Sequence, residues 1–480
     1  MALSPSQVWE VRTTGVDTNG GAFKAGAAGT DYSVQDVAQV AVADAVANGT
    51  TTLTSATATF SAAHVGNVVY LVGGSGSLAA ARREIVTFTN STTVVLDAVV
   101  ATGTGITLNL GGALLTFGEL ANATRGMVAS NKAFVKSGTY GITTGVTFAQ
   151  TVGSPGFSAT PSEIVGYKTT RGDIAFGVNA ANRPLINTNA SISALTFTGQ
   201  GWSIRNLQFG AGTTTPFRGM LVTGNVSVVA NCLVTSYSSS GFNTNAQLVG
   251  FHQCEATGGV AGALGGIVNG FNNGSIVGCY VHDGAGVGIQ ADGSITHNVI
   301  ANQSGTTADG IAATAYNAVL YNTVYNCGRH GISYTGMAPS TATVKGNILA
   351  KNGGYGLTNL GGAGLPARRE WDGNAYYNNT SSATPGGPRN NLDDTTVNPT
   401  NGIAPYTNVL DVLLASPNDP FTNAAGGDFS LNNTAGRGAL LRGTGPLNAW
   451  PGLTQVGYRD FGAIQHQDAG GTTITTFIEG

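Results

Sequence analysis

Residues 288–300 read GIQADGSITHNVI, residues 310–324 read GIAATAYNAVLYNTV, and residues 331–349 read GISYTGMAPSTATVKGNIL. Each stretch begins with glycine and an apolar residue, and each reaches an asparagine with an apolar residue two positions later. Outward from these stretches, the glycine pair recurs as Gly219-Met220, Gly241-Phe242, Gly266-Ile267, Gly288-Ile289, Gly310-Ile311, Gly331-Ile332 and Gly356-Leu357. A second column holds Cys232, Cys254, Cys279, Asn298, Asn322, Asn347 and Asn374. Two columns that keep their register in this way predict a solenoid.

The spacing of the columns predicts the structure of each repeat. A repeat of about 23 residues accommodates three short strands joined by turns, and successive repeats stack at about 4.8 Å. Strand alternation places the Cys/Asn position and the residue two later on the inward face. Stacked asparagines bond to one another along the axis, which predicts an internal ladder of Asn298, Asn322, Asn347 and Asn374. We expect the glycines to occupy sharp bends with unusual φ.

The cysteines fit the same pattern. Cys232, Cys254 and Cys279 occupy equivalent inward positions, whereas Cys327 lies outside that column. Parallel Cβ vectors at the repeat spacing lie slightly beyond good disulfide geometry, so we interpret these residues as small buried hydrophobic groups. Asn206 is a candidate for the start of the column, although Gln208 breaks the inward pattern there.

The fold class predicted is all-β: a right-handed parallel β-helix with a small antiparallel β insertion near the N-terminus and a C-terminal cap. Leucine-rich repeats would show a leucine scaffold, and propeller blades would need repeats of about 40 residues or more. We divide the chain into an N-terminal strand and capping helix (1–50), the insertion (51–114), the β-helix (115–380), C-terminal coils and cap (381–468) and an extended tail (469–480). Residues 33–47, with Ser33 as N-cap, and residues 115–132 are predicted to be short helices.

Composition excludes several classes of function. Charged residues make up 9% of the chain, with 21 Lys and Arg against 24 Asp and Glu, so no basic field is present to hold nucleic acid. No window approaches the ~18 apolar residues of a membrane span. The first residues lack a basic and an apolar segment, which predicts no secretory signal and synthesis in a host cytoplasm. His252, His282 and His297 lack metal-ligand spacing, and the glycine-rich runs lack a phosphate-loop lysine, so we predict no metal and no cofactor.

Several segments resemble a known superfamily. Val8–Arg12 with the turn-rich stretch from Gly15 to Gly21, and Ala133–Tyr140, resemble the opening and first rung of pectate-lyase-like β-helix proteins. Residues 419–421, 427–431 and 460–465 resemble the C-terminal cap of that superfamily, and Phe60–Gly66 is similar to segments of phage tail and spike proteins. The superfamily contains lyases, hydrolases, phage tailspikes and adhesins, so the resemblance implies a fold and leaves the function open.

Few side chains in the repeats suit acid–base chemistry. Asp309 and His330 precede successive repeat glycines and are predicted neighbours, with Arg329 and Asp292 near them. Glu370 and Asp372 are the other catalytic candidates, about two repeats further along. Polysaccharide hydrolysis needs two carboxylates about 5–10 Å apart, and no spacing here forces a pair together. We therefore interpret the stack as solvated surface, and the column of Asp283, Asn302, Asn326 and Asn378 as turn structure.

The densest charge cluster in the repeats runs from Arg368 to Asp372. Arg368, Arg369 and Trp371 are candidates for binding a glycan or a protein partner, because Trp and Arg suit such contacts. The rival interpretation, which we favour, is a surface loop whose Trp371 packs on the solenoid.

Together these features predict a bacteriophage virion surface protein, such as a capsid decoration, head spike, tail fibre or tailspike. We expect a homotrimer that binds capsid or tail proteins and host surface polysaccharide, without catalysis. The alternatives are a polysaccharide depolymerase (a lyase or glycoside hydrolase) on the same scaffold and a bacterial surface adhesin.

Overall fold

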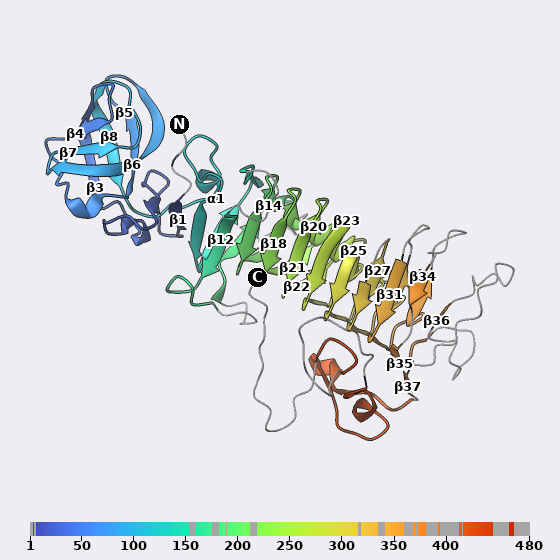
Figure 1. Ribbon diagram of the computed structural model, residues 1–480. Helices are drawn as coiled ribbons and strands as arrows, with labels where there is room; N and C mark the ends of the chain where they lie inside the picture. The colour runs from blue at the N-terminus through green and yellow to red at the C-terminus, as the bar shows by residue number, and fades with distance from the viewer. Residues whose placement is uncertain are drawn as a thin grey trace. The chain divides into compact units, whose positions relative to one another are not determined.

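The computed structural model describes residues 3, 6–152, 160–174, 182–188, 190–211, 218–314, 318–334, 341–359, 368–370, 373–380, 392–393, 412–414, 416–444 and 460–464 (Figure 1). The chain forms two compact units. Unit 1 comprises Met1–Ser238 and Phe242–Cys254, and unit 2 comprises Ser239–Gly241 and Glu255–Gly480. The fold is an all-β, right-handed parallel β-helix, as the repeat predicts.

Unit 1 begins with β1 (Gln7–Val11), β2 (Ala22–Lys24) and a closed six-stranded barrel, drawn in blue in Figure 1. The barrel strands, in the order β3-β4-β7-β6-β5-β8, are β3 (Val40–Ala47), β4 (Thr52–Thr54), β5 (Val68–Gly73), β6 (Leu78–Asn90), β7 (Thr93–Leu96) and β8 (Gly103–Leu110). Leu53, Leu71, Ile85 and Ile106 are among the residues that fill its interior. The predicted insertion is therefore present as a barrel, and its first strand begins before residue 51.

Both predicted helices differ from the structure. Within residues 33–47, only the short 3-10 helix η1 (Tyr32–Val34) forms, capped by Asp31, and Val40–Ala47 is strand β3. The alanines in this stretch suit a helix, but tertiary pairing with β8 decides the conformation. Within residues 115–132 the helix is limited to α1 (Phe117–Leu120), whose first turn Thr116 caps.

The coils of unit 1 use parallel strands that pair with the corresponding strand of the next coil. Its strands after the barrel are β9 (Lys132–Lys136), β10 (Thr139–Ile142), β11 (Val146–Phe148), β12 (Ser162–Tyr167), β13 (Leu185–Thr188), β14 (Ser193–Phe197), β15 (Trp202–Arg205), β16 (Gln208–Ala211), β17 (Arg218–Val222), β18 (Ser227–Ala230), β19 (Leu233–Tyr237) and β21 (Val249–His252). Strand β1 pairs in parallel with β9, so the N-terminal strand belongs to the same sheet as the first coil.

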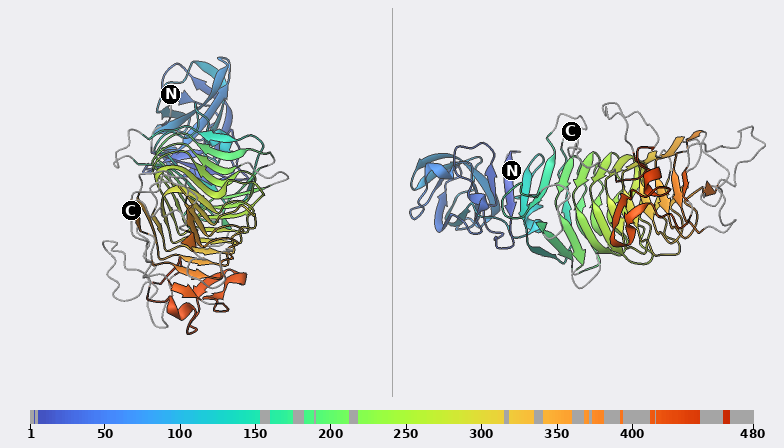
Figure 2. Two further views of the ribbon diagram at one scale, coloured as in Figure 1. Left: turned by 90° about the vertical axis from the view of Figure 1, so that its right-hand side faces the viewer. Right: turned by 90° about the horizontal axis from the view of Figure 1, so that it is seen from below.

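Unit 2 continues the same architecture, and Figure 2 shows its strands as a regular stack in yellow to orange. Its strands are β22 (Glu255–Gly259), β23 (Gly265–Val277), β24 (Tyr280–His282), β25 (Ile289–Thr296), β26 (Val299–Ala301), β27 (Ile311–Ala313), β28 (Ala318–Leu320), β29 (Thr323–Tyr325), β30 (Ile332–Tyr334), β31 (Thr341–Lys345), β32 (Ile348–Ala350), β33 (Leu357–Asn359), β34 (Arg368–Glu370), β35 (Ala375–Tyr377), β36 (Leu392–Asp393) and β37 (Val412–Leu414). Strand β20 (Ser240–Thr244) contains residues of both units. Strands β22, β24, β26, β29, β32, β35 and β37 follow one another in one parallel sheet.

The repeat glycines serve packing and not an unusual backbone conformation. The residues that follow them are fully buried, as predicted. However, none of the seven glycines has a positive φ, so the predicted bend is wrong. A Cβ on Gly310 would lie 2.2 Å from Val324 Cγ1, and one on Gly331 would lie 2.5 Å from the Gly356 carbonyl oxygen. Glycine is required at these two positions, because the coil interior at Gly310 and the next coil at Gly331 leave no room for a Cβ.

The predicted asparagine ladder is confirmed. Asn298, Asn322, Asn347 and Asn374 are completely buried. Asn322 Oδ1 accepts from the backbone N–H and Nδ2 of Asn298, both at 2.9 Å. Asn322 Nδ2 in turn donates to Asn347 Oδ1 at 3.0 Å and to the carbonyl of Ile295 at 2.9 Å. Each amide thus satisfies main-chain and side-chain groups at a corner of the coil.

Asn206 does not begin this ladder. The register pairs Gln208 with Leu233, which aligns Leu207 and not Asn206 with Cys232. Asn206 has a φ of 61° and accepts a bond from Asn231 Nδ2 at 2.8 Å. A second interior ladder, which the sequence analysis missed, joins Cys327 N–H to Asn352 Oδ1 and Asn352 Nδ2 to Asn379 Oδ1. The four cysteines are free and buried, and burial raises the pKa of Cys327 to about 12.

The described part of the C-terminal segment covers a side face of unit 2. The hairpin of β38 (Phe421–Asn423) and β39 (Asp428–Leu431), with the 3-10 helices η6 (Ala424–Gly426) and η7 (Gly438–Leu440), packs against the outward side chains of β26, β29, β32 and β35. Lys351 Nζ bonds Asp419 at 2.7 Å and Tyr325 Oη at 3.1 Å. The segment therefore shields a lateral sheet face, where the sequence predicts an end cap. The tail (469–480) and most of residues 381–411 lie outside the described residues.

We predict that Asn322→Leu lowers the free energy of unfolding by about 1–3 kcal/mol, because the Asn298 donors lose their buried acceptor. Chemical denaturation measures this change. Asn433→Leu, at an exposed position, serves as the matched control and should leave stability nearly unchanged. Equal stability of Asn322→Leu and the wild type would contradict a structural role for the ladder.

Candidate functional site

Asp309 and His330 are neighbours, as the repeat predicts, but Asp309 is held in a structural network. The Asp309 carboxylate is fully buried and accepts from Arg329 Nε at 2.6 Å, from the backbone N–H of His330 at 3.2 Å and from the Ser333 hydroxyl. A second guanidinium nitrogen of Arg329 completes a bidentate ion pair. His330 Nδ1 accepts the backbone N–H of Tyr355 at 3.1 Å. These partners occupy the Asp309 carboxylate and one ring nitrogen of His330, which are groups that acid–base catalysis would need.

Asp292 does not join this network. The register aligns Ala291 of β25 with Ala313, the last residue of β27. Asp292 therefore lies level with the position after the end of β27, whereas Asp309 precedes the first residue of β27. The predicted proximity of Asp292 to Asp309 is therefore wrong, because the intervening strand separates them. Asp292 is largely buried, and desolvation raises the pKa of its carboxyl group.

The charged stretch from Arg368 to Asp372 is only partly described. Arg368, Arg369 and Glu370 form strand β34, whose backbone pairs with Thr341–Thr343 of β31. Trp371 and Asp372 lie outside the described residues. The roles proposed for these side chains remain predictions.

The structure reveals an ionic cluster on the outer face of β22 and β24 that the sequence analysis missed. His282 Nδ1 lies 2.7 Å from Asp283 Oδ2, and His282 Nε2 lies 3.2 Å from Glu255 Oε1. The imidazole thus stands between two carboxylates, whose oxygens are no more than about 8 Å apart, a separation also found in glycoside hydrolases. Tyr280, two residues earlier on β24, stacks on the His282 ring with centroids 4.0 Å apart.

The turn after β24 positions the acidic end of this cluster. Asp283 has a φ of 51°, and Asn302 and Asn326 at the equivalent turns also have positive φ values. Asn302 Nδ2 donates to Asp283 Oδ1 at 3.0 Å, and Asn326 Nδ2 donates to Asn302 Oδ1 at 2.9 Å. The column is therefore turn structure, as predicted, and it also forms an exposed ladder linked to His282.

The contacts within the cluster shift the pKa values of His282 and Asp283. Burial of the imidazole acts to lower the pKa of His282, but hydrogen bonds to Glu255 and Asp283 outweigh it and raise the pKa. Burial acts to raise the pKa of Asp283, but bonds from His282 and Asn302 lower it. Below the raised pKa of His282, the ring is an imidazolium between two carboxylates. In that state both ring nitrogens donate, so the imidazole has no free site to act as a base.

Register is the signal that could have located the cluster. Glu255 pairs with Tyr280, and Thr257 pairs with His282, so the side chains of Glu255 and His282 point outward from adjacent strands. In the sequence, Glu255 and His282 are separated by a segment whose length varies between coils. Without the strand register, it is not evident that the two side chains lie close together.

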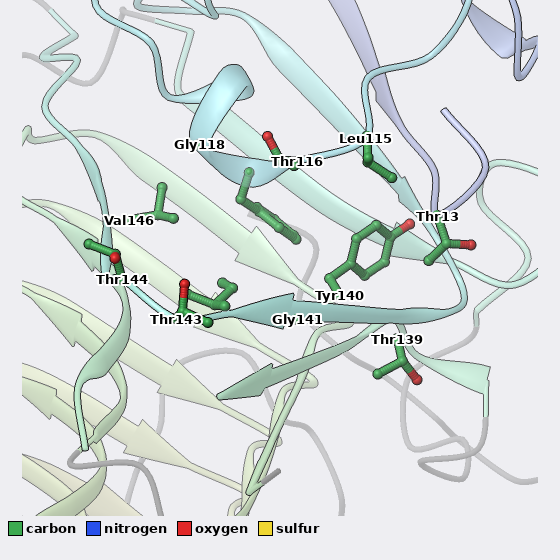
Figure 3. A pocket seen from close by; sticks show the side chains of 12 residues that line it. Thr13, Leu115, Thr116, Gly118, Thr139, Tyr140, Gly141, Thr143, Thr144 and Val146 are labelled. Carbon is green, nitrogen blue, oxygen red and sulfur yellow. The ribbon is translucent and has the colours of Figure 1, made fainter. Parts of the chain in front are cut away.

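Unit 1 contains a pocket of different character (Figure 3). Its volume is about 410 Å³, and its lining includes the hydroxyls of Thr13, Thr116, Thr139, Thr143 and Thr144 beside Leu115, Phe117, Tyr140, Ile142 and Val146. No residue of the lining is charged, so this pocket offers no acid–base pair. Within the described ranges, no group of three or more His, Cys, Asp or Glu side chains is arranged to hold a metal ion. No helix there combines the length and apolar character needed to cross a membrane.

Comparison with known proteins supports the fold. Residues 193–380 match the family model described as a right handed beta helix region. No curated protein sequence matches the chain. Among solved structures, pectate lyase Pel9A is similar, with 15% identity, a TM-score of 0.44 and coverage of 74% of this chain and 92% of that one.

Two further structures are similar. The catalytic domain of a GH87 alpha-1,3-glucanase has 10% identity and a TM-score of 0.34, over 74% of this chain and 88% of that one. The periplasmic alginate epimerase AlgG has 14% identity and a TM-score of 0.26, over 48% of this chain and 65% of that one. At these identities and TM-scores the similarity assigns no activity to this chain.

The raised pKa of His282 gives the cluster a pH signature. A group whose folded pKa is raised stabilises the protein fully below its unfolded pKa, and that contribution is lost as pH rises through the folded pKa. We therefore predict that His282→Gln lowers the thermal unfolding temperature at about pH 5.5, with the difference largely gone at about pH 9.

His252 provides the control, because burial lowers its pKa. For His252→Gln the loss of stability relative to the wild type should increase with pH, which is the opposite trend. A pH-independent effect of His282→Gln would contradict the charged state assigned to the cluster.

Proposed function

We propose that the chain is a glycan-binding structural protein that binds polysaccharide without cleaving it, on the surface of a bacteriophage particle. The observation that carries the binding role is the cluster of Tyr280, His282, Glu255 and Asp283. It combines a stacked pair of rings with two carboxylates on an outer face of unit 2. Sugars present apolar C–H faces that pack on such rings and hydroxyls that pair with carboxylates.

The same geometry supports binding over catalysis. A general acid must carry a proton near neutral pH, which usually requires a carboxyl group whose pKa is raised. Asp283 has a lowered pKa, and His282 is engaged at both nitrogens. Asp309 is neutralised by Arg329. These pairings favour fixed charges that orient a ligand.

One observation favours a second function, cleavage of polysaccharide by a lyase or glycoside hydrolase. Glu255 and Asp283 are separated by a distance compatible with a catalytic carboxylate pair. For this function, His282 would have to leave one carboxylate during the reaction so that the freed carboxyl group could carry a proton.

A binding and cleavage assay distinguishes the two functions. We predict that the wild-type protein binds a member of a panel of capsular and lipopolysaccharide preparations. We expect Glu255→Gln to weaken binding at least tenfold, because a charged hydrogen-bond acceptor contributes about 1.5–3 kcal/mol. Calorimetry measures the affinity, and assays for reducing ends and unsaturated uronate should detect no product.

Asp309→Asn is the matched control, since it removes a carboxylate from another part of the same unit. It should lower stability and leave the affinity unchanged. Products that appear with the wild type and disappear with Asp283→Asn would establish the enzymatic function instead.

The location and assembly form a separate part of the proposal. Buried free cysteines fit folding in a reducing cytoplasm. Identical subunits usually assemble with closed symmetry, and we propose a trimer. We predict that mass spectrometry detects the protein in purified particles of a phage that carries its gene. Light scattering should give a mass three times the 48.3 kDa of the chain. If the protein were absent from the particles, the proposed location would be contradicted. If it were a monomer in solution, the proposed trimer would be contradicted.

A further inference from the structure

The exposed ladder beside His282 is a row of polar groups along the axis of unit 2. Asp283, Asn302 and Asn326 occupy the same turn in three successive coils, and hydrogen bonds link each to the next. Asp283 also contacts His282 through its second oxygen. The row and the Tyr280–His282 ring pair are therefore continuous.

Each member of the row keeps capacity for a ligand. An asparagine side chain has two N–H donors and a carbonyl oxygen with two lone pairs. The hydrogen bonds within the row use one donor and one lone pair of Asn302 and one donor of Asn326. Asp283 and Asn326 are exposed, and Asn302 is half-buried, so the remaining groups are accessible from solvent.

The backbone holds this row in place. All three residues have φ values near +50°, a conformation that asparagine and aspartate adopt more readily than other non-glycine residues. The conformation orients the side chains before any ligand arrives, which reduces the entropy lost on binding.

The row ends at the next coil. Lys351 occupies the equivalent turn, with a φ of 54°, and its ammonium group is directed to Asp419 and Tyr325. Asn378 lies one coil further, beyond this lysine. The continuous binding surface therefore extends from Glu255 through Asn326, across four coils.

We infer that a linear glycan lies along the solenoid axis on this surface, with one sugar unit for each coil. This inference rests on the proposed glycan-binding function and names its ligand class. Coils repeat at about 4.8 Å, and a sugar unit in an extended β-1,4-linked chain advances by a similar distance. Successive sugars in such a chain are rotated by about half a turn and present opposite edges to the row, and a side-chain amide, which has both donors and an acceptor, suits either edge.

Charge restricts the ligand further. Glu255 and Asp283 outnumber the single imidazolium between them, and Lys351 is paired with Asp419. The surface thus repels polyanions and suits neutral glycans.

Calorimetry with oligomers of two to six β-1,4-linked glucose or N-acetylglucosamine units tests the inference. Affinity for at least one series should rise with each added sugar up to about four and then level off. Asn326→Gly removes one end of the row and retains the backbone conformation. It should weaken binding of the tetramer roughly five- to tenfold, the equivalent of one hydrogen bond, and leave the dimer unaffected.

Asn378→Gly is the matched control, because it makes the same change beyond Lys351, and it should bind like the wild type. The inference would be overturned if affinity did not depend on oligomer length, or if Asn326→Gly weakened binding of the dimer and the tetramer equally. It would also be overturned if polygalacturonate bound more tightly than the neutral oligomers, or if neither series bound. If a polysaccharide of the panel still binds through Glu255, those results leave the proposed function intact. Failure of the whole panel to bind would remove both.

Discussion

Every coil of this protein depends on hydrogen bonds to the coil before it and the coil after it. Strands supply most of these bonds, but the corners, where strands end, leave main-chain groups without partners. In the interior of unit 2, asparagine side chains provide hydrogen-bond partners for these main-chain groups. Asn298, Asn322 and Asn347 each bond the next side chain and a main-chain carbonyl.

The low charge content follows from the same architecture. A solenoid with a narrow interior has little room for an ion, and a buried charge is costly unless it is paired. Several of the buried charges are paired with an opposite charge. Glu10 lies between Arg12 and Arg171, Arg82 contacts Glu119, and Asp309 contacts Arg329. The outer cluster around His282 is different, because it keeps opposite charges at the surface where a ligand can reach them.

The sequence predicted the parts of the structure that repeat. The ladder from Asn298 to Asn374 and the buried residue after each glycine follow from periodicity, which a single chain displays directly. Predictions from local propensity did worse: the alanine-rich stretch before Ala47 is a strand, because its partner β8 lies some sixty residues away. The cluster of Glu255 and His282 was not predicted from the sequence, for a related reason. Its members meet only through the register of β22 and β24, which variable loops conceal.

The C-terminal segment has a consequence for the order of events during synthesis. Its hairpin packs on Ala301, Tyr325 and Tyr377, which belong to coils made much earlier. Until the hairpin has left the ribosome, the outward rings of these coils remain uncovered, and stacked strands with an apolar face tend to associate with other chains. Lys351 stands among these rings, and a charge placed there discourages such association before Asp419 arrives to neutralise it. The lysine that anchors the folded hairpin is therefore also a charge on the face that the hairpin covers, which disfavours association of that face while it is uncovered.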